Sequence, residues 1–302
     1  MAGKFLRSVG LALGATLASA QAFAAEGQPS PGELGMQDSV TPIADSIHAF
    51  HNGILLWTCI GISVLVLVLL AIVVLRFNKR ANPTPARFTH NTLIEVVWTA
   101  LPVIILVIIA IPSFAVLTDQ ETMPDGERKY LGSNIFSFGS VEVPAPELTV
   151  KVTGWQWFWN YEYVDQGKAF DSTMLNEEDR LAEASVQPRL LAVNNMLVVP
   201  VNTTVRVQVT AADVIHAFAV PSFGIIVDAV PGRLNETWFN SRKEGVFYGQ
   251  CRELCGKDHA YMPIAVRVVS AEAYATWLAA LEAGSIADAN ATLPPLAAAP
   301  AA

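Results

Sequence analysis

The residues best suited to chemistry lie in one short stretch, residues 248–262. It contains two thiols, an imidazole and a thioether, at Cys251, Cys255, His259 and Met262. Such groups are soft or borderline ligands, so the set suits copper and, without the methionine, zinc. An apolar run that alternates like a strand follows at residues 264–269. The ligands would therefore lie on a loop that a β-framework holds in place.

A second cysteine changes the kind of copper site that this loop can form. A mononuclear blue-copper site uses one cysteine, two histidines and a weak axial methionine. His216, beside strand-like sequence upstream, could supply the second histidine. Two thiolates in one loop can instead bridge two copper ions, each with one histidine and one weak axial ligand. Met262 can supply one axial ligand, and the main-chain carbonyl of Glu253 can supply the other.

Three other interpretations of the loop stay open at this point. Cys251 and Cys255 could form a disulfide, because the domain is expected outside the cytoplasm, where disulfides persist. The same cysteines could form a structural Cys2His2 zinc site with His216 and His259. Finally, His259 and Met262 could be ordinary packing residues.

The composition excludes several classes of protein. The chain of 302 residues is 52% hydrophobic and has a formal net charge of −8. This charge argues against nucleic acid as a partner. Three cysteines are too few for a disulfide scaffold. The third, Cys59, lies in an apolar run, where it is expected to pack.

The first residues have the pattern of a secretory signal peptide, residues 1–24. Two basic residues precede an apolar, alanine-rich stretch, and small residues mark a cleavage site at Ala22-Phe-Ala24, with Ala18-Ser-Ala20 as the alternative. Residues 25–53 then form the mature N-terminal segment. It is rich in Gly, Pro and Ser as far as about Asp45 and is expected to be loose there.

Residues 54–117 are predicted to form a transmembrane helical hairpin. The runs 54–75 and 96–117 are apolar, uncharged and long enough to cross a bilayer. The basic loop between them is expected on the cytoplasmic side, with both ends of the hairpin outside; its charges are Arg76, Lys79, Arg80 and Arg87. A pair of buried core helices is the alternative, which the length and the flanking charges disfavour.

Glu95 precedes the second apolar run, at its cytoplasmic end. Such a carboxylate is usually interfacial and solvated, but an acidic residue at a membrane face can also take up protons. Trp98, one turn further on, has the position of an interfacial anchor.

Residues 118–270 have an all-β pattern. The stretches 148–153 and 205–210 alternate apolar and polar side chains, as strands with one buried face do. Prolines and glycines separate such stretches, which is typical of a sandwich or a barrel. In the C-terminal part, 271–302, residues 271–283 are predicted to be a short helix and the rest a disordered, Ala/Pro-rich tail.

Two features of the β-domain could serve a partner. The acidic segment 164–183 is either a solvated loop or a docking surface for a basic protein, since complementary charge speeds encounter. The stretch 154–163 contains six aromatic residues, and strand alternation would place Trp155, Trp157 and Trp159 on one side. Such a stretch is usually core, but an exposed indole near a metal site would be a natural contact for a redox partner.

Together, these motifs resemble those of subunit II of the haem–copper cytochrome c oxidases, of the bacterial and mitochondrial kind. The resemblance covers nearly everything after the signal peptide. The aromatic stretch or the hairpin alone would be weak evidence, but the combination is highly specific. The motifs are Glu95-Val-Val-Trp-Thr-Ala-Leu-Pro102, Gly154-Trp-Gln-Trp-Phe-Trp-Asn-Tyr-Glu-Tyr163, Asp213-Val-Ile-His216, Val227-Asp-Ala-Val-Pro-Gly-Arg233 and Cys251-Arg-Glu-Leu-Cys-Gly-Lys-Asp-His-Ala-Tyr-Met262.

The resemblance implies a membrane-anchored all-β protein, in which an N-terminal two-helix transmembrane hairpin precedes a cupredoxin-like β-barrel. The barrel would lie outside the membrane and carry two copper ions in the dinuclear centre called CuA. The Glu253 side chain would also reach a magnesium ion shared with subunit I. By position, the copper ligands would be His216, Cys251, Glu253 through its carbonyl, Cys255, His259 and Met262.

The resemblance also assigns residues to partners. Trp157 matches the tryptophan through which cytochrome c passes its electron. Glu95 matches the carboxylate at the mouth of a proton-uptake path into subunit I. The acidic docking surface for cytochrome c would include Glu162, Asp171, Asp213 and Asp228, of which Asp171 lies in a segment of variable length.

The function implied by the resemblance is that of the electron-entry subunit of cytochrome c oxidase. It would accept electrons from cytochrome c at CuA and pass them to the haem-bearing subunit I, where oxygen is reduced to water with proton translocation. The chain has no Cys-x-x-Cys-His motif, so no c-type haem of its own is expected. It would lie in the bacterial inner membrane among the other oxidase subunits, with its N-terminus and copper domain on the periplasmic side.

Two alternative functions remain. A quinol oxidase subunit II shares the hairpin and the barrel but lacks the copper ligands, which are all present here. A membrane-anchored copper carrier needs an accessible, exchangeable site that is often rich in Met or His. The six Met and five His of this chain are not clustered in that way.

Overall fold

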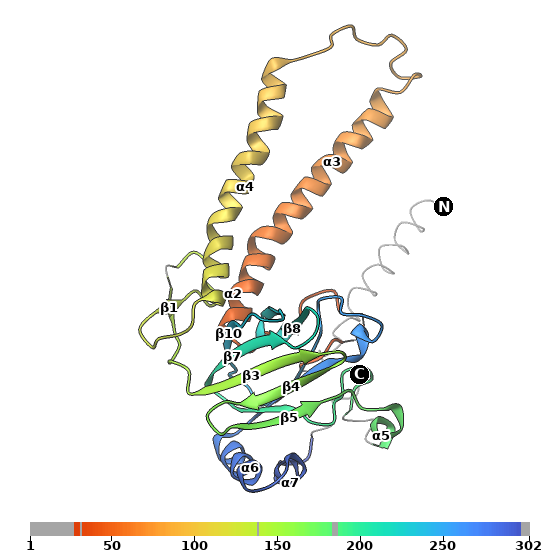
Figure 1. Cartoon of the computed structure of the whole chain (residues 1–302). Coiled ribbons are helices and arrows are strands. Elements are labelled where there is room, and N and C mark those ends of the chain that lie inside the picture. Colours follow the sequence, from red (N-terminus) through yellow and green to blue (C-terminus); the bar gives the residue numbers. More distant parts are fainter. Residues whose placement is uncertain (1–26, 31, 138, 183–186, 297–302) are drawn as a thin grey trace, which may run out of the picture. The chain divides into compact units, whose positions relative to one another are not determined.

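The computed structural model describes residues 27–30, 32–137, 139–182 and 187–296 (Figure 1). The expected signal peptide, residues 1–24, lies outside these ranges. The chain divides into two compact units. The helical unit comprises residues 42–144, and the β-unit combines the residues up to Thr41 with those from Ala145 onward.

The first membrane-length helix is continuous from Pro42 to Arg76. It comprises α2 (Pro42–Phe50), a π-helical turn (His51–Leu55) and α3 (Leu56–Arg76). The helix therefore starts before the predicted span 54–75, within the segment expected to precede the hairpin. Pro42 accounts for the early start, because its fixed φ suits the first helical position and its missing N–H is not needed there.

The second long helix, α4 (Thr92–Glu121), extends beyond the predicted span 96–117 at both ends. Its start is set by Asn91, whose side chain accepts a hydrogen bond from the Ile94 N–H (3.2 Å). The Asn91 N–H donates in turn to Glu95 Oε1 (3.3 Å). Glu95 therefore takes part in the cap of this helix.

Both long helices expose apolar side chains along their length. In the first helix, no part of the most apolar 18-residue window is buried. In the second helix, 11% of the corresponding window is buried. Exposing apolar surface to water is unfavourable by roughly 25 cal/mol per Å², a cost that the hydrocarbon core of a bilayer removes. Their length and exposure fit two membrane spans better than the alternative of buried core helices.

Residues 122–144 belong to the helical unit, although the sequence assigned them to the β-domain. The Asp119 carboxylate of α4 accepts the Leu131 N–H (2.7 Å), and Leu131 packs in a buried cluster with Val116. These contacts hold the segment to the end of the helix. A short ladder completes it, formed by β1 (Lys129–Tyr130) and β2 (Val141–Glu142).

Five strands form the larger sheet of the β-unit, in the order β10-β7-β3-β4-β5 (Figure 1). β3 and β7 pair in parallel, and the other neighbours are antiparallel. Every second residue of β3 and β7 is buried from Leu148 and Val205 onward, which confirms the predicted alternation. The strands are β3 (Leu148–Trp155), β4 (Phe158–Tyr163), β5 (Lys168–Ser172), β7 (Thr204–Ala211) and β10 (Asn235–Asn240).

Two smaller sheets carry the candidate ligands. In one, β12 (Pro263–Val269) pairs with β11 (Gly245–Gln250) on one side and, in parallel, with β6 (Leu197–Pro200) on the other. In the other, β8 (His216–Val220) and β9 (Ile225–Ala229) are antiparallel. β8 also packs beside β11, which brings the start of β8 close to the end of β11.

Aromatic side chains fill the space between β4 and β8. The rings of Trp159 and Phe218 meet edge to face with centroids 5.5 Å apart, and both side chains are fully buried. The prediction that Trp155, Trp157 and Trp159 share one side is wrong. β3 ends at Trp155 and the chain turns before β4 begins at Phe158, so Trp155 is 41% exposed while Trp159 is fully buried.

The segment that precedes the helices is bound to the β-unit, and we call residues 27–30 and 32–41 the N-terminal strap. At one end, the Tyr248 N–H of β11 donates to Gly27 O (2.7 Å). At the other, the Val40 N–H donates to Ser222 O (3.1 Å). This part of the segment expected to be loose is therefore attached at both ends.

The C-terminal part contains more structure than the sequence predicted. α6 (Ala271–Ala283) forms over the expected residues, but a further helix, α7 (Ile286–Ala291), occupies the tail expected to be disordered. α7 starts at a capping box, in which the side chains of Ser285 and Asp288 bind each other's main-chain N–H groups. The expected disorder is therefore wrong for this stretch.

Side-chain contacts attach α7 to the rest of the β-unit. Asn290 accepts the Trp277 indole N–H (3.1 Å) and donates to Asn195 (3.2 Å). Leu296, beyond the helix, packs against a cluster that includes Tyr248. The Ala-rich composition concealed these anchors, because each depends on a single residue.

Replacing Ser285 by Ala should loosen α7 without affecting α6. Losing a helix cap costs about 1 kcal/mol, which corresponds to roughly fivefold faster hydrogen exchange of the amides of 286–292. Exchange measured by mass spectrometry on the detergent-purified chain tests this. Ser270, which caps α6 in the same way, is the matched control, and Ser270→Ala should accelerate only 271–283. Equal exchange of α7 in both variants and the unmodified chain would contradict the assignment.

Candidate metal centre

The candidate ligands lie on the loop between β11 and β12 and at the start of β8. The loop runs from Cys251 to Met262. The Arg252 N–H donates to Ala217 O (3.1 Å), which holds the loop beside β8. The Trp159 indole N–H donates to Met262 O (3.2 Å), which holds the end of the loop. The β-framework thus fixes the segment that carries the ligands.

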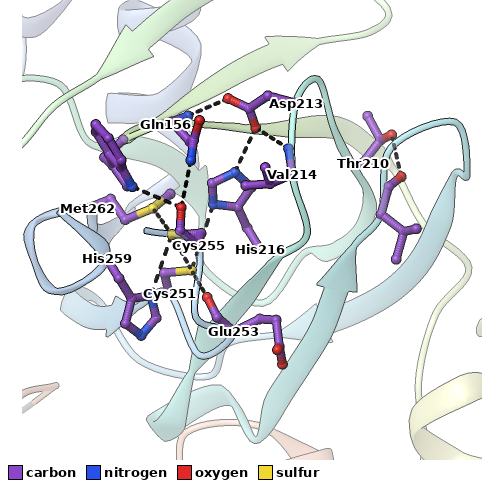
Figure 2. A network of polar contacts seen from close by, with 12 residues as sticks. Gln156, Thr210, Asp213, Val214, His216, Cys251, Glu253, Cys255, His259 and Met262 are labelled. Atoms are coloured by element: carbon purple, nitrogen blue, oxygen red, sulfur yellow. Dashed lines mark hydrogen bonds and ion pairs between the residues drawn. The ribbon is translucent and has the colours of Figure 1, made fainter. Parts of the chain in front are cut away.

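Two thiols form the middle of the cluster (Figure 2). Cys251 Sγ and Cys255 Sγ are 3.9 Å apart, and both residues are free cysteines. His216 Nδ1 lies 3.9 Å from Cys251 Sγ. The ligand atoms of these three residues all lie within 4.8 Å of one another, and no residue of the three is more than 4% exposed.

The remaining candidates each lie beside one of the thiols. His259 Nδ1 and Met262 Sδ are both 3.5 Å from Cys255 Sγ. The carbonyl oxygen of Glu253 is 3.3 Å from Cys251 Sγ. Each sulfur therefore has one imidazole nitrogen and one weak donor next to it, and the structure brings all six predicted ligand residues together.

This donor set fits a soft metal ion. Two thiols, two imidazoles and a thioether converge on one small region, and soft donors of this kind select copper or zinc. The alternative of packing residues does not explain why His259 points its Nδ1 at a thiol. A disulfide is not present in this structure, since both cysteines are free. The geometry alone leaves copper and a Cys2His2 zinc site as candidates.

The two thiols differ in how readily they lose a proton when no metal is bound. Burial raises the pKa of Cys251, but hydrogen bonds with His216 and with main-chain groups outweigh burial and lower that pKa to about 7. Burial and the neighbouring Cys251 raise the pKa of Cys255 to about 12. Because metals bind thiolates, loading of this pair must release the proton that Cys255 retains at neutral pH.

Asp213 holds His216 from the side opposite the thiols. Its Oδ1 lies 3.0 Å from His216 Nε2, while His216 Nδ1 faces Cys251. Asp213 also accepts the N–H groups of Val214 (2.6 Å) and Gln156 (2.7 Å). Burial raises the pKa of Asp213, but these bonds lower it below its ordinary value, so the carboxylate is ionised at neutral pH. A carboxylate in this position fixes the orientation of a metal-binding histidine.

Two glycines leave the space that the cluster needs. A side chain on Gly154 would lie 2.9 Å from the nearest ring atom of His216. A side chain on Gly256, which has φ +125, would lie 2.9 Å from the nearest ring atom of Trp157. Only glycine lets the imidazole pack on the backbone of β3 and the indole pack on the ligand loop.

Trp157 is half-buried and lies against the ligand loop. Its indole N–H donates to the carbonyl of Cys255 (3.2 Å), and the Lys257 ammonium lies 5.7 Å from the ring centroid. The Gln156 side chain donates to the same Cys255 carbonyl (2.8 Å). A partly exposed indole is therefore hydrogen-bonded to the main chain of a candidate ligand.

The four acids predicted to dock a partner lie on four different segments, three strands and the loop before β8. Glu162 of β4 and Asp171 of β5 lie on the outer face of the large sheet, where Glu162 pairs with Lys151 (3.2 Å). Asp228 is exposed on β9, in another sheet. The Asp213 side chain is 28% exposed, and its carboxylate is occupied by His216 and the two main-chain donors described above.

Two predicted carboxylates lie away from the thiols. The Glu253 side chain is exposed, and Figure 2 shows it pointing away from the sulfurs while its carbonyl faces them. Glu95 belongs to the helical unit, in the first turn of α4, where it accepts the Asn91 N–H.

Sequence reasoning missed two contributions to this site. The bond between Asp213 and His216 had a signal, since an acid three residues before a histidine is well placed to reach its ring. Gln156 had almost none, because it is a lone amide within an aromatic stretch. Its role depends on the turn between β3 and β4, which the alternation pattern did not predict.

Two family models match the chain. Residues 148–269 match the model described as cytochrome c oxidase subunit II, periplasmic domain, and residues 29–116 match the one described as its transmembrane domain. The chain belongs to the cytochrome c oxidase subunit II family. The predicted fold class, a two-helix membrane anchor followed by a cupredoxin-like β-domain, is confirmed.

Named relatives agree with this assignment. The chain is 45% identical over 276 residues to the "Probable cytochrome c oxidase subunit 2" of Rickettsia bellii, covering 91% of this chain and 93% of that one. It is 44% identical over 290 residues to the subunit 2 of Cereibacter sphaeroides, covering 90% and 89%. A crystal structure of the periplasmic domain of the Bradyrhizobium japonicum subunit II shares 57% identity, with a TM-score of 0.43, over 47% of this chain and 97% of that one.

Membership of this family makes the chain a membrane-anchored subunit of a haem–copper oxidase, which is an oxidoreductase complex with further subunits. The relatives are named as subunits of cytochrome c oxidase. These names disfavour both the quinol oxidase subunit and the copper carrier.

Proposed function

We propose that this chain is the electron-entry subunit of its oxidase. It accepts electrons from cytochrome c at a dinuclear copper centre and passes them to the haem-bearing subunit I, where oxygen is reduced to water with proton translocation. One observation carries the proposal: four further donors converge on two buried thiols, and a partly exposed indole is hydrogen-bonded to the main chain of one of the cysteines.

Copper is favoured over zinc by the family and by the donors. A zinc site is complete with four donors, whereas here Met262 and the carbonyl of Glu253 also lie beside the thiols. A dinuclear copper centre would supply a one-electron carrier that spreads the change of charge over both metals. The residues His216, Cys251, Glu253, Cys255, His259 and Met262 would hold it.

The chain's own residues keep this carrier rigid. The ligands lie on strand ends and on a loop pinned by main-chain hydrogen bonds, and Asp213 orients His216. Ligands that do not move when the charge changes permit fast electron transfer, because little bond or solvent rearrangement is needed. The hydrogen bond from Trp157 to Cys255 gives the electron a direct route from the surface to a ligand.

Cytochrome c would dock near Trp157. Glu162, Asp171, Asp213 and Asp228 are the acids proposed to attract it, and complementary charge mainly raises the rate of encounter. Apolar side chains are exposed on the ligand loop, residues 251–262, such as Leu254 (78% exposed) and Tyr261 (48% exposed). They suit a contact from which cytochrome c must also dissociate quickly.

Two further carboxylates are proposed to serve subunit I. The exposed side chain of Glu253 is free to bind a magnesium ion shared with subunit I, since only its carbonyl faces the thiols. Glu95, beside the basic loop, is proposed to lie at the mouth of a proton-uptake path. Its place in a helix cap supports a fixed position for the carboxylate.

The orientation follows from the charges that flank the spans. The exposed loop between α3 and α4 is basic, which favours the cytoplasmic face of a bacterial inner membrane. The strap and the β-unit would then both lie on the periplasmic side, where soluble c-type cytochromes can reach the copper centre.

The metal content of the purified protein tests the central claim. Two copper ions per chain are expected, together with an electron paramagnetic resonance signal whose hyperfine structure is shared by two copper nuclei. In the control Cys251→Ser, the bridge between the metals is lost, so a shared signal should disappear. One copper with localised hyperfine structure, or bound zinc, would overturn the proposal, as would protein that purifies without metal and with an intact Cys251–Cys255 disulfide.

Stopped-flow measurements at several ionic strengths can follow the reduction of the oxidase by cytochrome c. They test the electron-entry role of Trp157 separately from the docking role of Glu162. Trp157→Phe should slow reduction roughly tenfold at every salt concentration, a barrier change of about 1.4 kcal/mol, with copper retained. Glu162→Gln should slow it only at low salt, because mobile ions screen exposed charges. Loss of Glu162 also leaves Lys151 unpaired, which adds to the effect.

Glu236 provides the matched control for the docking acid. It is an exposed acid on β10 in the same large sheet, and it also forms an ion pair, with Arg206. Glu236→Gln should leave the salt dependence unchanged. The docking claim fails if both glutamate variants behave alike, and the entry claim fails if Trp157→Phe loses copper or keeps the normal rate.

Glu95→Gln should slow proton uptake and steady-state turnover while leaving reduction of the copper centre unchanged. Proton uptake by reconstituted oxidase during single turnover provides the measurement. Asn91→Ala disturbs the same helix cap but keeps the carboxylate, so it should have little effect. If Asn91→Ala slows uptake as much as Glu95→Gln does, the carboxylate acts only through the helix.

A further inference from the structure

Gln156 joins two segments that carry ligands (Figure 2). Its side-chain amide donates to the carbonyl of Cys255 (2.8 Å). Its main-chain N–H donates to Asp213 Oδ2 (2.7 Å), and the other oxygen of the same carboxylate contacts His216 Nε2 (3.0 Å). One residue in the turn between β3 and β4 is therefore connected to the ligand His216 on one side and to the ligand Cys255 on the other.

The part of the ligand loop around Cys255 depends on such outside contacts. Its neighbours Glu253, Leu254 and Gly256 are exposed, while the Cys255 thiol is buried. Two side chains from the turn donate to its carbonyl, and the bond from Gln156 (2.8 Å) is shorter than that from Trp157 (3.2 Å). The position of the Cys255 main chain is thus set largely from the β3–β4 turn.

The turn itself is well fixed. β3 lies between β4 and β7 in the large sheet, and the Asp213 carboxylate accepts the Gln156 N–H (2.7 Å). The Gln156 side chain therefore extends from a fixed turn, and its hydrogen bond to the Cys255 carbonyl holds the loop in position.

We propose that Gln156 is a positioning residue for the copper centre. Its amide holds the Cys255 main chain, and through it the separation of the two thiols on which a bridged pair of copper ions depends. This inference rests on the proposed function, and it assigns to Gln156 a task that does not involve contact with cytochrome c.

A role at the docking surface is the competing explanation, because Gln156 is exposed. The two roles call for different chemistry. A docking contact needs only a polar group at the surface. A residue that positions the loop needs an N–H donor on a side chain long enough to reach the Cys255 carbonyl. The shorter Gln156→Asn keeps the amide but not the reach, and Gln156→Leu keeps much of the bulk but not the donor.

The experiment compares both variants with the unmodified oxidase, purified as the intact complex. Gln208→Leu is the matched control, because Gln208 is also a partly exposed amide of the large sheet and donates to Glu236, away from the copper ligands. Three quantities are measured: release of copper to a chelator, the copper hyperfine pattern, and the salt dependence of reduction by cytochrome c. Hydrogen exchange of residues 251–262 in the copper-free protein gives a fourth, which does not require metal.

Both Gln156 variants should release copper about tenfold faster, as is typical when a residue that supports a metal ligand is lost. They should also alter the hyperfine pattern and speed exchange of 251–262, while their salt dependence stays that of the unmodified protein. Gln208→Leu should change none of these quantities.

Two results would overturn the inference. One is normal copper release, hyperfine pattern and loop exchange in both Gln156 variants. The other is an altered salt dependence in Gln156→Leu that Gln156→Asn restores, which would assign the residue to docking. Failure of the proposed function looks different, because the unmodified oxidase would then lack two coppers with shared hyperfine structure.

Discussion

The structure depends on keeping two thiols 3.9 Å apart in a buried place. Once both are thiolates, they repel each other, and the interior screens this repulsion far less than water does. Without metal, burial and the neighbouring Cys251 raise the pKa of Cys255, and the proton that it retains avoids the repulsion. Bound cations take the place of that proton, so the protein must hold the pair in position before the cations arrive. A flexible loop would instead let the cysteines separate.

Three segments that are distant in sequence hold the site around the thiols rigid. The β3–β4 turn, the start of β8 and the β11–β12 loop meet at the thiols, and each is tied to another by hydrogen bonds that involve main-chain groups. Asp213 connects two of these segments, since its carboxylate contacts His216 and accepts the Gln156 N–H at the same time. An acid proposed to attract a partner is therefore also part of the support of a ligand, and its two tasks cannot be separated by removing it.

The sequence predicted what single residues and regular patterns determine. Ligand types and spacing predicted the cluster at Cys251 and Cys255, and alternation predicted β3 and β7. Patterns failed where one contact changes the outcome. The turn after Trp155 breaks the alternation, a capping box at Ser285 starts a helix in an Ala-rich tail, and Asp119 ties the segment after α4 to the helical unit. Tertiary contacts of this kind leave no periodic signal.

The N-terminal strap makes the β-unit discontinuous along the chain. Residues on both sides of the two membrane helices complete it, because Gly27 and Val40 bind to β11 and to the turn after β8. The strap is synthesised before both membrane helices, whereas the residues that bind it, Ser222 and Tyr248, are synthesised after them. The strap can therefore form these contacts only after both helices and the chain as far as Tyr248 have been made. A pair of hydrogen bonds thus imposes an order on folding, in which the β-unit is completed only after the helical unit has been synthesised.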